Sequence, residues 1–141
     1  VKKLKIQDRV NINRNVDGVK VEFKEGMIFD SGSANPNNEF ARVTSTVMKI
    51  IANSPKKYSL TVEGHTDDVP IKTKSFRDNW QLSSARSYEL LKKFKEIGVS
   101  EERISLVAFA HTRPKIPVKN LTGKELTAAR AQNRRVVIRI N

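Results

Sequence analysis

The chain has 141 residues, of which 38% are hydrophobic and none is Cys. This length suits one domain with a substantial core, no apolar run is long enough to cross a bilayer, and the lack of Cys excludes disulfides and thiolate metal sites. Lys and Arg total 27 against 15 Asp and Glu, a formal net charge of +12 at pH 7, which favours attraction to polyanions. Because the chain begins with Val rather than Met, we expect it to be part of a longer protein.

The first third of the chain predicts a hairpin followed by a helix. Alternating apolar residues at 10–12 and 19–23 flank Asp17 and Gly18, a pair typical of a hairpin turn. Asn35 before Pro36 is typical of a helix N-cap and first helical position. Apolar residues then recur at helical spacing, namely Phe40, Val43, Val47, Ile50 and Ile51, before a stop at 53–55.

The middle of the chain predicts a strand, a long loop, a helix and another strand. YSLTVEG at 58–64 alternates, with Leu60 and Val62 on one face. A loop runs to about residue 78, and Gly98 is a natural C′ residue for the helix that follows it. The strand RISLVAF occupies 103–109. The stripe on the helix consists of Ser83, Ser87, Leu90, Phe94 and Ile97.

The last part of the chain predicts a short helix and a closing strand. Thr122 and Glu125 suit a capping box, and RVVIRI at 135–140 alternates. Strands that alternate with helices after an initial hairpin indicate an α/β (α+β) two-layer sandwich, a small mixed sheet with helices on one face. We expect the other face to be solvated, because its positions are polar: Ser59, Thr61, Glu63, Arg135 and Arg139.

The loop after the strand at 58–64 offers three kinds of chemistry. His65, Asp67 and His111 are suitable metal ligands, although the chain has only two His. Asp67 and Asp68 are candidates for acid–base catalysis, but neighbours on an extended loop point apart. Asp67 and Arg86 together would instead form a cradle for a zwitterion, the carboxylate accepting from an ammonium and the guanidinium fork binding a carboxylate. The plainer alternative is that these two side chains only pair with each other.

Six motifs in a fixed order carry a resemblance to a known family. They are FDSGSA at 29–34, VEGHTDD at 62–68, NWQLSSARS at 79–87, GVSEERI at 98–104, AFAHTRP at 108–114 and NRRVVI at 133–138. In this order they resemble the OmpA-like peptidoglycan-binding domain over about 19–140. The long segment GHTDDVPIKTKSFRDNWQLS is similar to that of flagellar stator subunits within the family.

The resemblance implies a binding site for the stem peptide of peptidoglycan. In the family, the residue that matches Asp67 holds the ammonium of diaminopimelate, and the one that matches Arg86 binds its carboxylate. The other residues that the resemblance assigns to this pocket are Asn79, Arg134, Thr66 and Asn35. We interpret His65 as a packing residue, and Phe76 and Trp80 as anchors of the long loop. Replacing Asp67 or Arg86 with Ala is expected to abolish binding to the wall and leave the fold intact.

The resemblance also implies a role. We expect an N-terminal extension and hairpin strand at 1–18 and a wall-binding domain at 19–141, in the periplasmic part of a protein anchored in the inner membrane. It would anchor a flagellar stator to peptidoglycan, as a homodimer with a MotA-type ion-channel partner held through a transmembrane segment outside this sequence. We expect no enzymatic activity, cofactor, metal or nucleic acid. The alternative is a wall anchor of an outer-membrane protein or lipoprotein.

Overall fold

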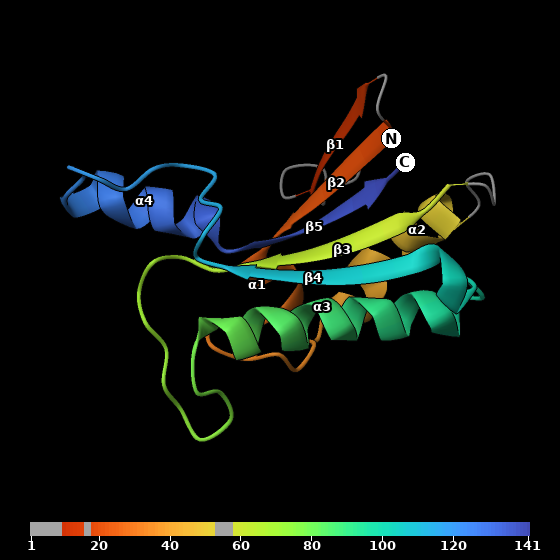
Figure 1. Cartoon of the computed structure of the whole chain (residues 1–141), viewed down its shortest axis with the longest axis horizontal. Coiled ribbons are helices and arrows are strands. Elements are labelled where there is room, and N and C mark those ends of the chain that lie inside the picture. Colours follow the sequence, from red (N-terminus) through yellow and green to blue (C-terminus); the bar gives the residue numbers. More distant parts are fainter. Residues whose placement is uncertain (1–9, 16–17, 53–57) are drawn as a thin grey trace.

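A mixed sheet forms the centre of the molecule (Figure 1). The computed structural model describes residues 10–15, 18–52 and 58–141. The strand order is β1-β2-β5-β3-β4, in which β3 and β4 pair in parallel and the other neighbours pair antiparallel. The strands are β1 (Val10–Asn15), β2 (Gly18–Lys24), β3 (Leu60–His65), β4 (Ile104–Ala110) and β5 (Arg135–Ile140). The predicted hairpin is confirmed as β1 and β2, while Asp17 and the stop signal at 53–55 lie outside the described residues.

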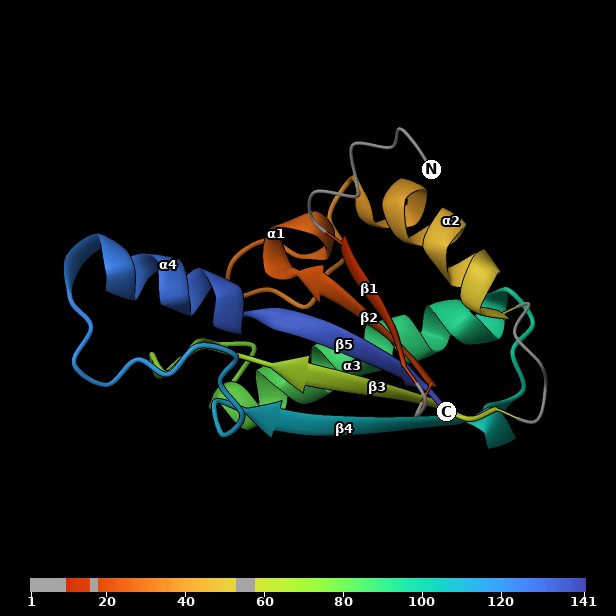
Figure 2. The ribbon, with the colours of Figure 1, turned by 90° about the horizontal axis from the view of Figure 1, so that it is seen from above.

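The two long helices cover one face of this sheet, as predicted. The helices are α1 (Glu25–Ile28), α2 (Phe40–Ala52), α3 (Asn79–Glu96) and α4 (Gly123–Asn133). α3 runs beneath β3 and β4, and α2 lies on the same side (Figures 1 and 2). α4 projects beyond the sheet, and its buried residues are Ala129 and Asn133. No helix in the described part of the chain is both long and apolar enough to span a membrane.

The apolar face of the sheet packs on α2 and α3 to form the core. Leu60 and Val62 are fully buried, which confirms that they share the inner face of β3. The alternate residues of β2 and β5 join them, and α2 contributes Val47, Met48 and Ile51 while α3 contributes Leu90 and Phe94. Gly98 has φ +100°, so it ends α3 in the left-handed conformation that its position predicts.

The start of α2 differs from the prediction. The helix begins at Phe40, and Pro36 instead pairs with Phe29 in an isolated antiparallel bridge. Asn37 turns the chain, because its side-chain oxygen accepts from the N–H of Glu39 at 3.1 Å and its own N–H bonds to Ile28 O at 3.0 Å. The predicted N-cap at Asn35 is therefore wrong. The Asn-Pro pair favours a helix start locally, but the bridge between Pro36 and Phe29 keeps this segment extended.

The second face of the sheet carries buried charges, so the expectation of a simply solvated face is wrong in part. Glu63 and Arg135 are only 6% and 8% exposed. Glu63 pairs with Arg139 Nε at 2.5 Å and with His65 Nε2 at 3.1 Å, and the His65 ring stacks on Phe109 with centroids 5.2 Å apart. Long side chains of opposite charge on neighbouring strands cover one another, which alternation of polar residues in the sequence does not reveal.

Gly64 brings α3 close to the sheet and so fixes the position of the helix. A Cβ atom there would lie 2.2 Å from the main-chain oxygen of Ser83. Ser83 and Ser87 are fully buried, with Ser83 Oγ accepting from the N–H of Ala110 at 3.3 Å and Ser87 Oγ donating to Val107 O at 3.3 Å. These contacts set the register of α3 against β3 and β4, and thereby the position of every side chain that α3 presents at its N-terminal half.

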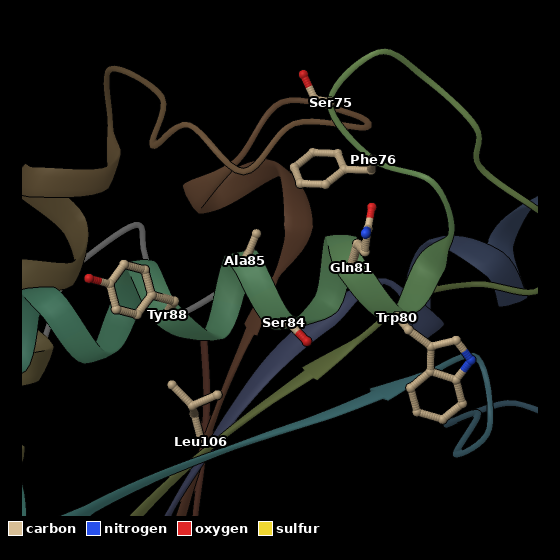
Figure 3. A pocket seen from close by; sticks show the side chains of 8 residues that line it. All are labelled: Ser75, Phe76, Trp80, Gln81, Ser84, Ala85, Tyr88 and Leu106. Atoms are coloured by element: carbon tan, nitrogen blue, oxygen red, sulfur yellow. The ribbon is translucent and has the colours of Figure 1, made fainter.

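The outer face of α3 carries an open hollow beside the edge strand β4. Trp80 is 47% exposed, so it does not anchor the long loop in the core as expected. It lines an open hollow of about 640 Å³ together with Phe76, Tyr88 and Leu106 (Figure 3). This hollow lies on the side of α3 away from the core.

Candidate functional site

A pocket of about 200 Å³ lies between the loop that follows β3, the α1 segment and the start of α3. Five of the six residues that the sequence assigned to a binding site line it, while Asn35 lines a neighbouring hollow with Ser33 and Asn37. The polar lining includes Glu25, Thr66, Asp67, Asn79, Arg86 and Arg134, and the apolar wall is Val69, Pro70, Ile71 and Leu82.

Asp67 is held at the pocket by a tightly bonded turn. The N–H of Thr66 donates to Ala110 O at 2.8 Å, which ties the end of β3 to the end of β4. Asp67 Oδ1 accepts from the N–H of Val69 at 3.0 Å, and Asn79 Nδ2 donates to Val69 O at 3.0 Å. Asn79 therefore holds the turn from the first residue of α3. The carboxylate of Asp67 is fixed in position rather than free on a loop tip.

Arg86 enters the same pocket from α3 and is only 3% exposed. Its Nε donates to Ser33 O at 2.8 Å, and its Nη2 donates to Asp30 O at 3.1 Å and pairs with Glu25 Oε2 at 2.8 Å. Burial lowers the pKa of Arg86, and the charge of Glu25 opposes that shift. The guanidinium, which the sequence predicts to bind a ligand carboxylate through two parallel bonds, already uses Nε and Nη2 for bonds within the protein. Nη1 is the Arg86 nitrogen that bonds to no described residue.

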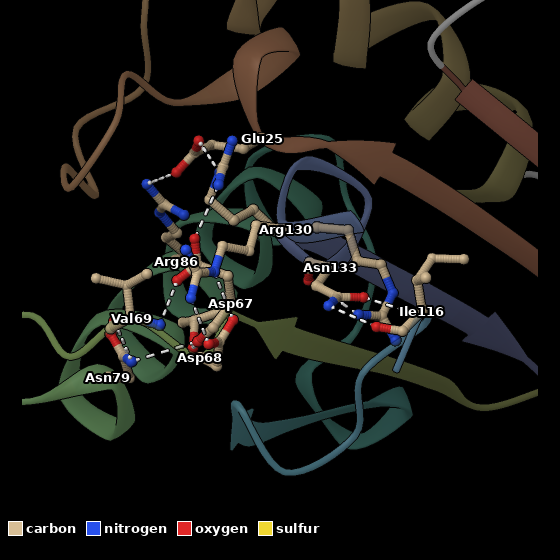
Figure 4. Close-up of polar contacts among 12 residues, drawn as sticks. Glu25, Asp67, Asp68, Val69, Asn79, Arg86, Ile116, Arg130 and Asn133 are labelled. Carbon is tan, nitrogen blue, oxygen red and sulfur yellow. Dashed lines mark hydrogen bonds and ion pairs between the residues drawn. The ribbon is translucent and has the colours of Figure 1, made fainter. Parts of the chain in front are cut away.

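A chain of alternating charges connects the two predicted residues. Glu25 Oε1 accepts from Arg134 Nε at 2.9 Å, and Arg134 Nη1 donates to Asp67 Oδ2 at 2.8 Å (Figure 4). Although burial opposes it, the hydrogen bond to Asp67 and the charge of Glu25 raise the pKa of Arg134. Asp67 and Arg86 therefore do not merely pair with each other: they flank one pocket and are linked through Arg134 and Glu25.

Glu25 is the site residue that sequence reasoning missed. It is the first residue of α1, a four-residue helix that has too few residues to show helical periodicity. Its bonding partner Arg134 lies 109 positions away. In the sequence, Glu25 is an acidic residue that directly follows an alternating strand. This position does not distinguish it from any other surface carboxylate.

Two further contacts join the segment that carries α4 to neighbouring loops, one an exposed ion pair and the other a pair of hydrogen bonds from Asn133. Asp68, which had no assigned role, makes a bidentate pair with Arg130 at 2.9 Å for both bonds, and the hydrogen bond from Arg130 lowers the pKa of Asp68. Asn133 accepts from the N–H of Ile116 at 2.8 Å and donates to Ile116 O at 3.0 Å (Figure 4). The two bonds of Asn133 fix the end of α4, from which Arg134 enters the pocket just before β5 begins at Arg135.

The structure does not bring together the residues of the metal and catalytic alternatives. His65 bonds to Glu63 on the second face of the sheet, and His111 lies edge-on to Trp80 with centroids 6.5 Å apart. The described residues contain no group of three His, Cys, Asp or Glu side chains able to hold one metal ion. Asp67 and Asp68 bond to different arginines, so they do not form a pair that shares a proton.

Comparisons with known proteins identify the family of the chain. The OmpA family matches residues 28–134. Motility protein B of Bacillus subtilis is 25% identical over 141 residues, which cover 99% of this chain and 51% of that protein. The chain thus spans about half the length of the curated relatives it matches.

Solved structures with the same fold include a periplasmic domain and a cell wall anchor. The periplasmic domain of Helicobacter pylori MotB is 25% identical, with a TM-score of 0.80 over 99% of this chain and 85% of that one. The cell wall anchor of the T6SS from Pseudomonas aeruginosa is 29% identical, with a TM-score of 0.74 over 93% of this chain and 86% of that one. On the family match and on these likenesses, the chain belongs to the OmpA family.

Proposed function

We propose that this chain is the wall-binding part of a flagellar stator subunit and that its pocket holds the stem peptide of peptidoglycan. The ligand group would be an amino-acid end with both an ammonium and a carboxylate, as in diaminopimelate. The observation that carries the proposal is the convergence of Asp67, Arg86 and Arg134 on one small pocket. The name of the Bacillus subtilis relative and the T6SS wall anchor support the same role.

The pocket offers complementary partners for both charges of such a group. Asp67 keeps lone pairs for an ammonium, because a carboxylate accepts more bonds than the two that its oxygens receive from Val69 and Arg134. Arg86 and Arg134 each retain a terminal nitrogen that bonds to no described residue, and these would donate to the carboxylate. Binding is non-covalent and needs no bond to be made or broken in the wall.

The same proposal covers the location of the chain, its dimerisation and its partner in the membrane. Residues 19–141 would form the wall-binding unit and 1–18 its extension, in the periplasmic part of a subunit anchored in the inner membrane. One site of this size would bind weakly, so a homodimer and several stator copies on one continuous wall would supply the hold through avidity. A MotA-type ion-channel subunit would be the partner within the membrane.

Pull-down with purified sacculi tests the proposal. Asp67→Asn keeps the shape of the side chain and removes its charge, and we expect it to lower binding at least about tenfold, a loss in the range measured when a close charge pair is broken. Asp68→Asn is the matched control, since Asp68 bonds to Arg130 and does not line the pocket. Wild-type binding by Asp67→Asn, with its fold checked by circular dichroism, would overturn the proposal. A swimming assay separates a stator from an anchor of another envelope assembly. A strain that carries Asp67→Asn should lose motility if the chain belongs to a stator and keep it if the chain anchors another assembly.

A further inference from the structure

We infer that Glu25 determines the charge specificity of the pocket. Its carboxylate cancels one of the two arginine charges, so that the pocket accepts a zwitterionic end and rejects a simple anion. This inference rests on the proposed function and adds to it the residue that selects the ligand class.

Glu25 is fixed at the pocket by both its side chain and its main chain. The side chain is 12% exposed, and its two oxygens bond to two different arginines, Oε2 to Arg86 Nη2 at 2.8 Å and Oε1 to Arg134 Nε at 2.9 Å. Its N–H also donates to Arg134 O at 3.1 Å. A residue whose carboxylate is held at two points and whose main chain is held at a third does not move aside for a ligand, so its charge is a permanent part of the pocket.

The formal charges of the pocket lining sum to zero because of Glu25. The charged residues that line it are Glu25, Asp67, Arg86 and Arg134. Without Glu25 the sum would be +1, on a chain whose formal net charge is already +12. A buried or half-buried site with excess positive charge would attract any carboxylate or phosphate. Specificity of this kind needs an element that disfavours the wrong ligand as well as one that favours the right one.

The hydrogen bonds of Glu25 also limit what the arginines can offer. It takes Nη2 of Arg86 and Nε of Arg134, so neither guanidinium presents two free parallel donors to a ligand carboxylate. Each arginine keeps one terminal nitrogen without a bond to a described residue. A ligand carboxylate is therefore held by single contacts from two residues, and the ammonium contact to Asp67 becomes necessary for binding.

The experiment compares two peptides in wild-type protein and in Glu25→Gln. The first probe is the stem tripeptide that ends in diaminopimelate with its side-chain amino group free, and the second is the same peptide with that amino group acetylated. We expect wild-type protein to prefer the free peptide at least about tenfold in isothermal titration. Glu25→Gln keeps the shape of the side chain but leaves the pocket with one uncompensated positive charge, so it should tighten binding of the acetylated peptide and reduce this preference to about twofold or less.

Two controls keep the outcome decisive. Asp68→Asn should keep the wild-type preference, and so should Glu25→Asp, which retains the charge if Glu25→Gln does not fold. An unchanged preference in folded Glu25→Gln would overturn the role of Glu25 while leaving the stem-peptide site standing. Equal binding of both peptides by wild-type protein would overturn the role of Glu25 and also the proposed contact between Asp67 and the ligand ammonium. Wild-type protein that binds neither peptide would overturn the proposed function and this inference with it.

Discussion

Replacing Arg86 with Ala should destabilise the fold as well as the site. The guanidinium is almost completely buried and makes three polar contacts, with the carbonyl oxygens of Ser33 and Asp30 and with the carboxylate of Glu25, besides lying over the Phe29 ring. Hydrogen bonds to charged groups contribute about 1.5–3 kcal/mol each, and removing one partner of a buried ion pair costs about 3–5 kcal/mol. These contributions are not additive, so we expect Arg86→Ala to lower the free energy of unfolding by about 4 kcal/mol.

Urea unfolding followed by far-ultraviolet circular dichroism measures this loss. A domain of this size has a total stability of about 5–15 kcal/mol, so the shift in midpoint would be large. Arg86→Lys keeps the charge but loses the planar fork, and it should lose about half as much. A loss below about 1 kcal/mol for Arg86→Ala would refute the reasoning, because a buried arginine with three partners cannot be removed without effect. The expectation from sequence that this variant leaves the fold intact is thus revised, and Asp67→Asn is the cleaner test of binding.

Three other substitutions test separate parts of the structure. Burial lowers the pKa of His65 below its ordinary value of 6.5, so its contribution to stability should be complete above pH 6.5 and decline as the pH falls below it. His65→Gln should flatten the decline in the free energy of unfolding between pH 7.5 and 5. If the variant and the wild-type protein show the same dependence of stability on pH, His65 is not the group that causes the decline. Gly64→Ala places a Cβ atom 2.2 Å from Ser83 O and should cost more than about 2 kcal/mol and weaken sacculus binding, whereas Gly26→Ala, with nothing within 4 Å, should change neither. Asp68→Asn should leave the urea midpoint unchanged because its ion pair is exposed to solvent, and a clear shift would show that this pair matters to the fold.

The sequence determined the elements whose signals are local. Alternation identified β3 and β5, and the apolar stripe with Gly98 identified α3, because one-sided burial imposes a period of two on strands and 3.6 on helices. The ordered motifs indicated the family, and the opposite charges of Asp67 and Arg86 pointed to one pocket. These inferences depend on spacing along the chain, which the sequence displays directly.

The tertiary structure alone decided which charges meet. Whether Arg86 pairs with Asp67, with a ligand or with Glu25 depends on how a short segment after β2 packs against α3, and no local pattern encodes that. The same holds for Glu63, which becomes buried and pairs with the half-exposed Arg139 because β3 and β5 become neighbours although they are far apart in the chain. Ion pairs form between side chains that are close in space. Which charged residues pair can therefore be known only from the packing of the sheet and helices.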